Sequence, residues 1–87
     1  MHNHWIVDLD FDEDEDRTTC TAKLSGFSAP GAVGTGTARR SPADTPDQVV
    51  GEELAAARAC SDLAHSLIDQ AAAGIEQQTH EPSRLTR

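Results

Sequence analysis

The sequence has few of the residues that usually build a hydrophobic core. Tyrosine is absent, and the 87 residues include one Trp and two Phe. Leu, Ile, Val and Phe together number 15, below the level of roughly 20% at which a highly charged chain is expected to be disordered. An ordered fold therefore requires regular placement of these few residues, and an isolated chain would be only marginally stable.

Long apolar runs and closely spaced cysteines are also missing. No stretch approaches the ~18 apolar residues of a membrane span, and no basic start followed by an apolar run predicts a secretory signal. Cys20 and Cys60 form no CxxC motif, which argues against a disulfide scaffold. We expect one cytoplasmic domain over residues 1–87, with both cysteines buried as small hydrophobic residues.

Basic residues are scarce, and the acidic residues are concentrated at one end. Lys and Arg number 7 against 15 Asp and Glu, giving a net charge of −8. Residues 1–16 contain seven of the carboxylates and no Lys or Arg. Because non-specific binding to nucleic acid depends on basic side chains that neutralise phosphates, we expect no affinity for naked nucleic acid.

Two segments alternate apolar and polar residues with the period of two that is typical of a half-buried strand. They are residues 4–12 and 17–24, and the acidic residues between them predict a hairpin. A two-residue turn at Asp14-Glu15 aligns the two apolar faces. It places Asp12 opposite Arg17, Leu9 opposite Cys20, Val7 opposite Ala22 and Trp5 opposite Leu24. Trp5, the only tryptophan, is expected to anchor the core.

Residues 32–40 predict a third strand with Gly34, Gly36 and Ala38 on one face. Glycine weakens a strand unless another part of the chain must approach closely. We therefore expect a helix to pack on this glycine face.

Residues 46–79 repeat with the helical period of 3.6, and residues 80–87 form a tail. Thr45 as N-cap, Pro46 at the first position and Gln48 form a helix start. The predicted sheet-facing stripe is Leu54, Ala57, Cys60, Ala64, Leu67, Ile68, Ala71 and Ile75. Such a helix is about 50 Å long and a nine-residue strand about 30 Å. It must overhang the sheet, break near Gly51 or Gly74, or be covered by a second subunit.

The predicted fold is α+β with two layers: a three-stranded antiparallel β-meander followed by one long C-terminal helix. The thin core, the long helix and the two open sheet edges together predict a homodimer.

Motifs for catalysis or for a bound cofactor are absent from the sequence. The acidic segment lacks the Gly and the twelfth-position Glu of a calcium loop, and the His and Cys spacings fit no zinc pattern. We find no P-loop, no dinucleotide motif and no nucleophile–histidine–acid order. The chain is therefore expected to be neither an enzyme nor a metal or cofactor protein.

Four strings carry a resemblance to a family of small actinobacterial proteins of unknown function. They are HWIVDLDFDED at 4–14, GTGTARRSPAD at 34–44, GEELAAARACSDLAHSLID at 51–69 and THEPSRL at 79–85. The resemblance implies a fold like that of double-stranded-RNA-binding domains and intertwined homodimers. It also implies a likeness in shape to ribosome hibernation factors, a link to dormancy or stress responses, and no catalytic residues.

Two functional interpretations stay open. The first is a non-catalytic stress or dormancy accessory factor that contacts the ribosome or its proteins. The alternative is an acidic module that binds a basic protein without ribosome contact. In both, the candidate interaction surface consists of the hairpin tip and the basic end of the third strand: Asp12, Glu13, Asp14, Glu15, Asp16, Arg39 and Arg40.

Overall fold

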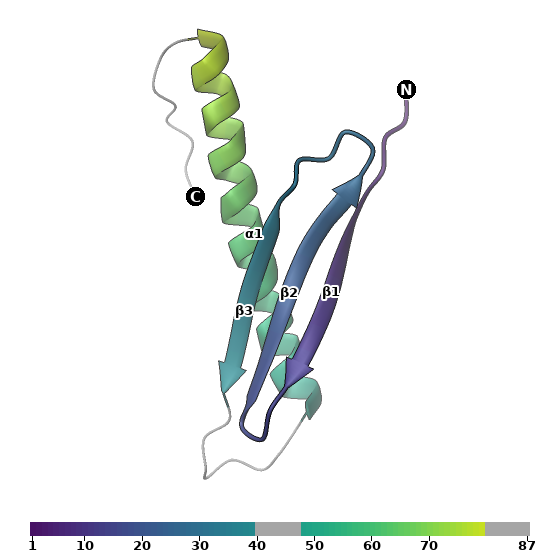
Figure 1. The fold of residues 1–87 in the computed structure, drawn as a ribbon, viewed down its shortest axis with the longest axis vertical. Coiled ribbons are helices and arrows are strands. Elements are labelled where there is room, and N and C mark those ends of the chain that lie inside the picture. The colour runs from purple at the N-terminus through teal and green to yellow at the C-terminus, as the bar shows by residue number, and fades with distance from the viewer. Residues whose placement is uncertain (40–47, 80–87) are drawn as a thin grey trace.

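The computed structural model describes residues 1–39 and 48–79, and it has three strands followed by one helix (Figure 1). The elements are β1 (Trp5–Glu13), β2 (Arg17–Gly26), β3 (Val33–Arg39) and α1 (Gln48–Thr79). The strands form one antiparallel sheet in the order β1-β2-β3. The predicted two-layer α+β fold is confirmed. Arg40, the helix start at Thr45 and Pro46, and the tail 80–87 lie outside the described residues.

The β1–β2 hairpin has its turn one residue later than predicted. The amide N–H of Asp14 donates to the carbonyl of Arg17 at 2.8 Å, so the turn is Glu15-Asp16. The side chains of Asp14 and Arg17 also form an ion pair of 3.5 Å, which favours these two residues as the closing pair of the hairpin. The predicted register is therefore wrong by two residues: Val7 lies opposite Leu24, Leu9 opposite Ala22, Phe11 opposite Cys20, Asp12 opposite Thr19 and Trp5 opposite Gly26.

A register shift of two residues keeps every side chain on its own face of the sheet. Leu9 and Phe11 therefore share a face with Ala22 and Cys20, as the alternation predicts. The coincidence of the two apolar faces is confirmed although the predicted pairs are not.

α1 packs on the glycine face of β3 and on the adjacent face of β2. A Cβ added to Gly36 would lie 2.3 Å from the backbone nitrogen of Ala59, and one added to Gly34 would lie 2.3 Å from that of Leu63. Real Cβ atoms do not approach so closely, so these two glycines allow the helix and sheet backbones to touch. The predicted close approach of the helix to this face is confirmed.

The helix does not present the predicted stripe to the sheet. The buried helical residues are Ala55, Ala59 and Leu63, with Leu67 partly buried against them. Most of the predicted stripe is exposed, including Leu54 and Cys60. The physical reason is size: a glycine surface this close to the helix axis accepts Ala55 and Ala59, whereas Leu54 and Ile75 point elsewhere.

The core is small and consists mainly of alanine. Its buried members are Cys20, Ala22, Leu24, Ala32, Ala38, Ala55, Ala59 and Leu63. Trp5 is not among them and is 46% exposed. The prediction that Trp5 anchors the core of a single chain is therefore wrong, because α1 covers β2 and β3 and leaves β1 beside it.

The chain is elongated. Its Cα radius of gyration is 16.4 Å, whereas a compact chain of this length would have about 12 Å. α1 runs through both Gly51 and Gly74, and its last turns project beyond the end of the sheet (Figure 1). Of the three outcomes expected for so long a helix, the structure shows the overhang.

Candidate functional site

β1 is the element least integrated into the fold, because all nine of its residues are exposed. On the side that faces the helix layer it carries a row of apolar side chains, which we call the β1 apolar row. Its members are Trp5 (46% exposed), Val7 (43%), Leu9 (39%) and Phe11 (36%). A row of large apolar residues exposed to this degree is typical of a contact surface.

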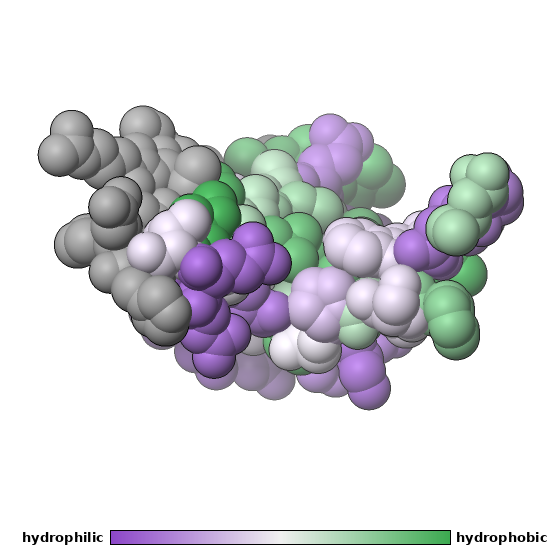
Figure 2. Space-filling view, turned by 90° about the horizontal axis from the view of Figure 1, so that it is seen from above, coloured by the Kyte–Doolittle hydropathy of each residue, from purple (hydrophilic) through white to green (hydrophobic). Residues whose placement is uncertain are grey.

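α1 carries a second exposed apolar surface, which we call the α1 outer stripe. It comprises Val50, Leu54, Ala57, Ala64, Ile68, Ala71 and Ile75. Val50, Leu54 and Ile75 are each more than 40% exposed. Figure 2, viewed down the long axis, shows hydrophobic residues at the surface beside polar ones. The two surfaces together expose more large apolar side chains than the core of the chain buries.

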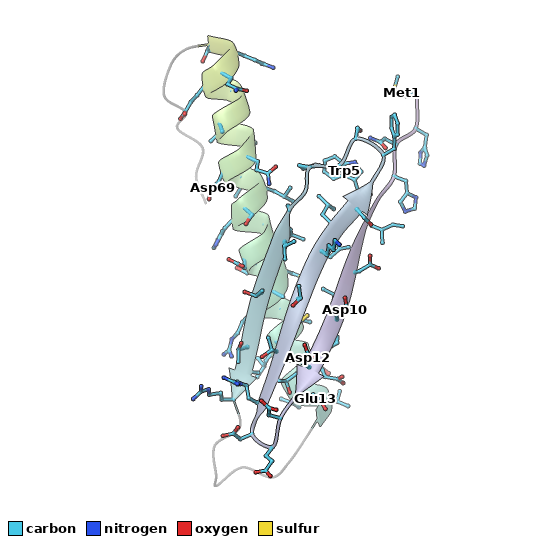
Figure 3. The ribbon with its side chains drawn as sticks, viewed as in Figure 1. Met1, Trp5, Asp10, Asp12, Glu13 and Asp69 are labelled. Atoms are coloured by element: carbon cyan, nitrogen blue, oxygen red, sulfur yellow. The ribbon has the colours of Figure 1, made fainter. Side chains whose placement is uncertain are left out.

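The other face of β1 carries a row of carboxylates, which we call the β1 acidic row: Asp8, Asp10 and Asp12. In the neighbouring strand, Asp10 lies opposite Thr21 and Asp12 opposite Thr19. Asp10, Asp12 and Glu13 follow one another along β1 in Figure 3. Only Asp8 has a basic residue, Lys23, as its cross-strand partner. The outer face of the sheet is therefore acidic along β1 and hydroxyl-rich beside it.

The predicted candidate surface is brought together in part. The hairpin gathers Asp12 to Asp16 at one end of the sheet, and β3 ends beside it because Arg39 lies opposite Arg17. An ion pair of 3.5 Å joins Arg17 to Asp14, with both side chains largely exposed. Arg40 lies outside the described residues. The arginines thus offset part of the charge of the tip, and exposed pairs of this kind contribute about 0–1 kcal/mol.

The outer edge of β3 is closed by side chains of α1. The carboxylate of Asp62 accepts a hydrogen bond from the Thr35 amide at 2.9 Å. The guanidinium of Arg58 donates to the Thr37 carbonyl at 2.7 Å. The sequence patterns described above do not single out either residue. Their spacing of four residues, which places them on one side of a helix, is the signal that could have identified them.

The two cysteines differ in environment. Cys20 is fully buried and Cys60 is exposed, so the prediction that both lie in the core is right for the first and wrong for the second. Burial raises the pKa of the Cys20 thiol, and the neighbouring charges of Cys60 and Asp10 raise it further. Cys20 is therefore a neutral thiol at pH 7, and Cys60 is the cysteine that reagents can reach.

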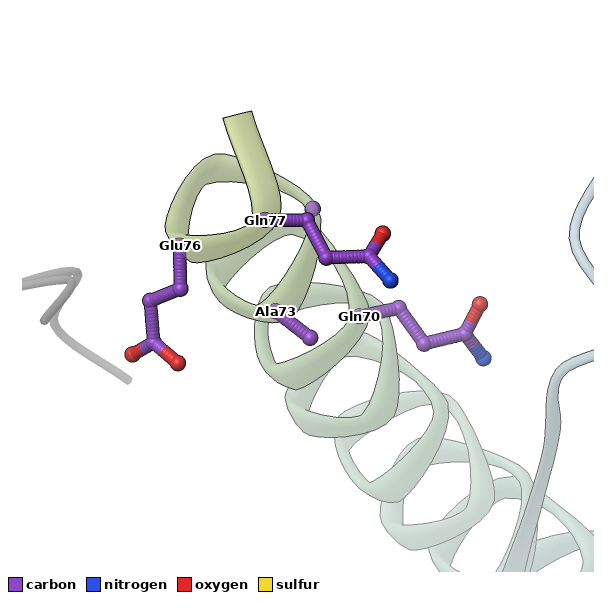
Figure 4. A pocket seen from close by; sticks show the side chains of 5 residues that line it. Gln70, Ala73, Glu76 and Gln77 are labelled. Carbon is purple, nitrogen blue, oxygen red and sulfur yellow. The ribbon is translucent and has the colours of Figure 1, made fainter. Parts of the chain in front are cut away.

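The described residues were compared with the requirements of a metal site and of an enclosed pocket. Within residues 1–39 and 48–79, no three His, Cys, Asp or Glu side chains cluster as metal ligands. A hollow beside the last turns of α1 is lined by Gln70, Ala73, Gly74, Glu76 and Gln77 (Figure 4). Because these residues come from a single helix, the hollow is an open flank of α1. None of the described helices is long and apolar enough to cross a membrane.

Comparison with known proteins places the chain among a set of similar small proteins. The family model described as Rv2632c-like matches residues 3–84. The uncharacterised protein Mb1767 of Mycobacterium bovis is 42% identical over 82 residues, which cover 94% of this chain and 86% of that protein. The uncharacterised protein Rv2632c of Mycobacterium tuberculosis is 43% identical over 76 residues, which cover 87% of this chain and 81% of that protein.

A solved structure shares the fold. The crystal structure of Rv2632c superposes with a TM-score of 0.82 and is 40% identical in sequence. The match covers 94% of this chain and 96% of that one. The likeness therefore extends over the sheet and the long helix together.

Proposed function

The chain belongs to the Rv2632c-like family, and from this premise we propose that it acts without catalysis, as a homodimeric docking protein whose contact element is β1. One observation carries the proposal: β1 has no buried residue, and it is apolar on one face and acidic on the other. Such a strand contributes backbone pairing with β2 but no buried side chain to its own chain. It is suited to contacts with other molecules on both of its faces.

A second copy of the chain is the proposed occupant of the apolar side. Each copy carries both the β1 apolar row and the α1 outer stripe. In a two-fold dimer, the α1 outer stripe of each copy can therefore pack on the β1 apolar row of the other. The thin alanine core and the elongated shape support this arrangement, since a single chain buries little apolar surface. At −8 per chain, the two acidic hairpin tips must lie far from the two-fold axis.

A basic protein is the proposed partner of the acidic side. The β1 acidic row leads along the strand to the acidic hairpin tip, and Asp10, Asp12 and Glu13 follow one another there in Figure 3. Such a surface attracts Lys- and Arg-rich surfaces, speeds their association and repels phosphates. A partner protein is therefore favoured over naked nucleic acid.

The resemblance of the sequence supports a more specific form of this proposal. In that form, the chain is a cytoplasmic stress or dormancy factor, with a fold likened to double-stranded-RNA-binding domains and to hibernation factors, that binds the ribosome. The acidic face would then contact basic ribosomal proteins rather than ribosomal RNA, because rRNA phosphates are repelled. The alternative is a basic partner that is not ribosomal.

Site-specific photo-crosslinking in cells tests the docking. A crosslinking residue in place of Asp10 is expected to capture a discrete basic protein, and the same residue in place of Glu76 on α1 is the control. Neutralising Asp8, Asp10 and Asp12 to Asn is expected to abolish the capture by a crosslinker placed at Thr21. A matched change of Glu52, Glu53 and Glu76 to Gln is expected to leave it intact. Equal labelling from both positions, or none from Asp10, would contradict the proposal.

Co-sedimentation with purified ribosomes separates the two forms. Binding that is strong at low salt, weakens steeply at moderate salt and is lost in the Asn variant supports ribosome contact. Crosslinks to a discrete basic protein without co-sedimentation favour the non-ribosomal partner.

A further inference from the structure

We propose that the open edge of β1 binds an extended segment of the partner protein as a fourth strand, and that this segment alternates basic and apolar residues. The inference deepens the docking function proposed above and rests on it. It names the chemistry of the partner segment and the backbone groups that bind it.

The hairpin geometry defines which backbone groups of β1 are open. Because Asp14 and Arg17 form the closing hydrogen-bonded pair, hydrogen-bonded pairs alternate with non-bonded pairs from there along the hairpin. Asp12 and Asp10 therefore bond to β2. The amide and carbonyl groups of Val7, Leu9 and Phe11 point away from β2, to the outer edge of the sheet.

The two edges of the sheet differ in whether side chains of α1 bond to their outward backbone groups. On β3 two of the corresponding outward groups are bonded to α1: the Thr35 amide donates to Asp62, and the Thr37 carbonyl accepts from Arg58. β1 has nine residues, no proline and no bulge in its pairing with β2. Proteins usually protect such an edge with charges that point inward, with proline or with a covering element. Among the described residues, side chains of α1 bind backbone groups of β3, whereas the edge of β1 is guarded only by the charges of its own acidic row.

The two faces of β1 select the side chains of an added strand. Cross-strand neighbours on one face lie about 4.5–5.5 Å apart at Cβ, close enough to pair. On one side the neighbours of the added strand would be Val7, Leu9 and Phe11, which favour apolar residues. On the other side they would be Asp8, Asp10 and Asp12, which favour Lys or Arg. The preferred segment therefore alternates apolar and basic residues over five to seven positions, as strand addition in general combines backbone affinity with side-chain specificity.

The β1 edge of a second copy is a poor occupant. Antiparallel pairing of β1 with itself would place one acidic row directly beside another on the same face, and like charges in that position are destabilising. A helix from a second copy on the β1 apolar row is compatible with strand addition, since the helix lies in the layer above the sheet and the added strand lies in its plane.

Hydrogen exchange followed by NMR with a synthetic peptide tests the inference. The probe is a seven-residue peptide that alternates Lys or Arg with Val, and the control has the same composition with the basic residues grouped at one end. The alternating peptide is expected to slow exchange at the amides of Val7, Leu9 and Phe11 at least tenfold. The amides of Asp10 and Asp12, already bonded to β2, are expected to change little.

A variant with Asp8, Asp10 and Asp12 changed to Asn provides a second arm. It keeps the backbone edge, so it is expected to bind the alternating peptide at least tenfold more weakly while retaining the same pattern of amide protection at saturation. Binding of both peptides with no selective protection of Val7, Leu9 and Phe11 would overturn strand addition and leave charge-based docking standing. Failure of the alternating peptide to bind at all would also overturn the inference, whereas the crosslinking at Asp10 judges the docking function independently.

Discussion

At Gly36 the backbone of the sheet and the backbone of the helix are in contact with no side chain between them. The nearest helix atoms to a Cβ at this position would be the nitrogen of Ala59 and the carbonyl oxygen of Ala55, at 2.3 and 2.5 Å. Neither atom can move without displacing a whole turn of α1. The absence of a side chain here is therefore a structural requirement.

The change Gly36→Ala is expected to destabilise the protein by about 3 kcal/mol, the upper end of the usual cost of overpacking. Gly74→Ala is the matched control, because nothing lies within 4 Å of its added Cβ and alanine is favoured over glycine in a helix by about 1 kcal/mol. Urea denaturation of both variants measures the two effects. Equal stability of the two variants would show that the helix does not rest on the glycine face.

Cys20 links stability to alkaline pH. Its folded-state pKa is raised by burial, so its contribution to stability is complete below the unfolded pKa of about 8.5 and is lost as the pH rises through the folded value. In reducing buffer, the free energy of unfolding is expected to fall between pH 7 and pH 10. Cys20→Ala is expected to lower stability at pH 7 and to flatten this decline, whereas Cys60→Ala should change the decline much less, because burial is the largest cause of the raised Cys20 pKa and Cys60 only the second. If the free energy of unfolding of Cys20→Ala declined as steeply with pH as that of the parent, the Cys20 thiol would not be the group responsible.

The elements show where sequence patterns were sufficient. The period of two located β1 and β2, the period of 3.6 located α1, and the glycines located the face on which the helix packs. The hairpin register was missed because Asp14-Glu15 and Glu15-Asp16 are equivalent as acidic turns. Only the closing contact between Asp14 and Arg17 distinguishes them.

The helix stripe was missed for a different reason. Hydrophobicity favours Leu54 and Ile75 as buried residues, but the available space favours Ala55 and Ala59. The helix has an apolar stripe on each of two sides, and a single-chain pattern cannot tell which one meets the sheet. The acidic candidate surface was predictable from the hairpin, whereas the closure of the β3 edge by Arg58 and Asp62 depends on how the helix lies across the sheet.

At the level of elements, the closure of the β3 edge can be tested by opening it. Asp62→Ala removes the acceptor of the Thr35 amide, so exchange at that amide is expected to accelerate at least tenfold. Asp69→Ala, one helical turn or more beyond, is the control and should leave the Thr35 amide unchanged. If the Thr35 amide exchanges at the same rate in Asp62→Ala and in the parent, the hydrogen bond to Asp62 does not protect this edge of the sheet.

The whole molecule is a small, acidic and elongated particle with two exposed apolar surfaces. A monomer of this kind exposes the β1 apolar row and the α1 outer stripe to water at once. Burial of apolar surface stabilises by about 25 cal/mol per Å². Covering both surfaces would therefore add substantially to the stability that the small core provides. Self-association would then be part of folding, and the stability of the protein would depend on its concentration.

Leu54→Lys tests the role of the α1 outer stripe in this association. A lysine at this exposed helical position keeps the helix propensity and places a charge where the second copy would lie. The variant is expected to dissociate at concentrations at least tenfold higher than the parent in sedimentation experiments, with unchanged helix content by circular dichroism. Gln70→Lys, which adds a lysine on the side of α1 opposite the α1 outer stripe, is the control. If Leu54→Lys dissociates at the same concentration as the parent, the α1 outer stripe is not part of the interface.

Hydroxyl-radical footprinting of the full chain at rising protein concentration tests most directly whether β1 is a contact element. Trp5, Leu9 and Phe11 on the β1 apolar row, with Leu54 on α1, are expected to react fully when dilute and to become protected together at micromolar concentrations. Phe27, which is 88% exposed in the β2–β3 loop, serves as the internal reference and should react equally throughout. Reactivity of the β1 apolar row that stays constant relative to Phe27 at every concentration, in a folded protein, would contradict the account.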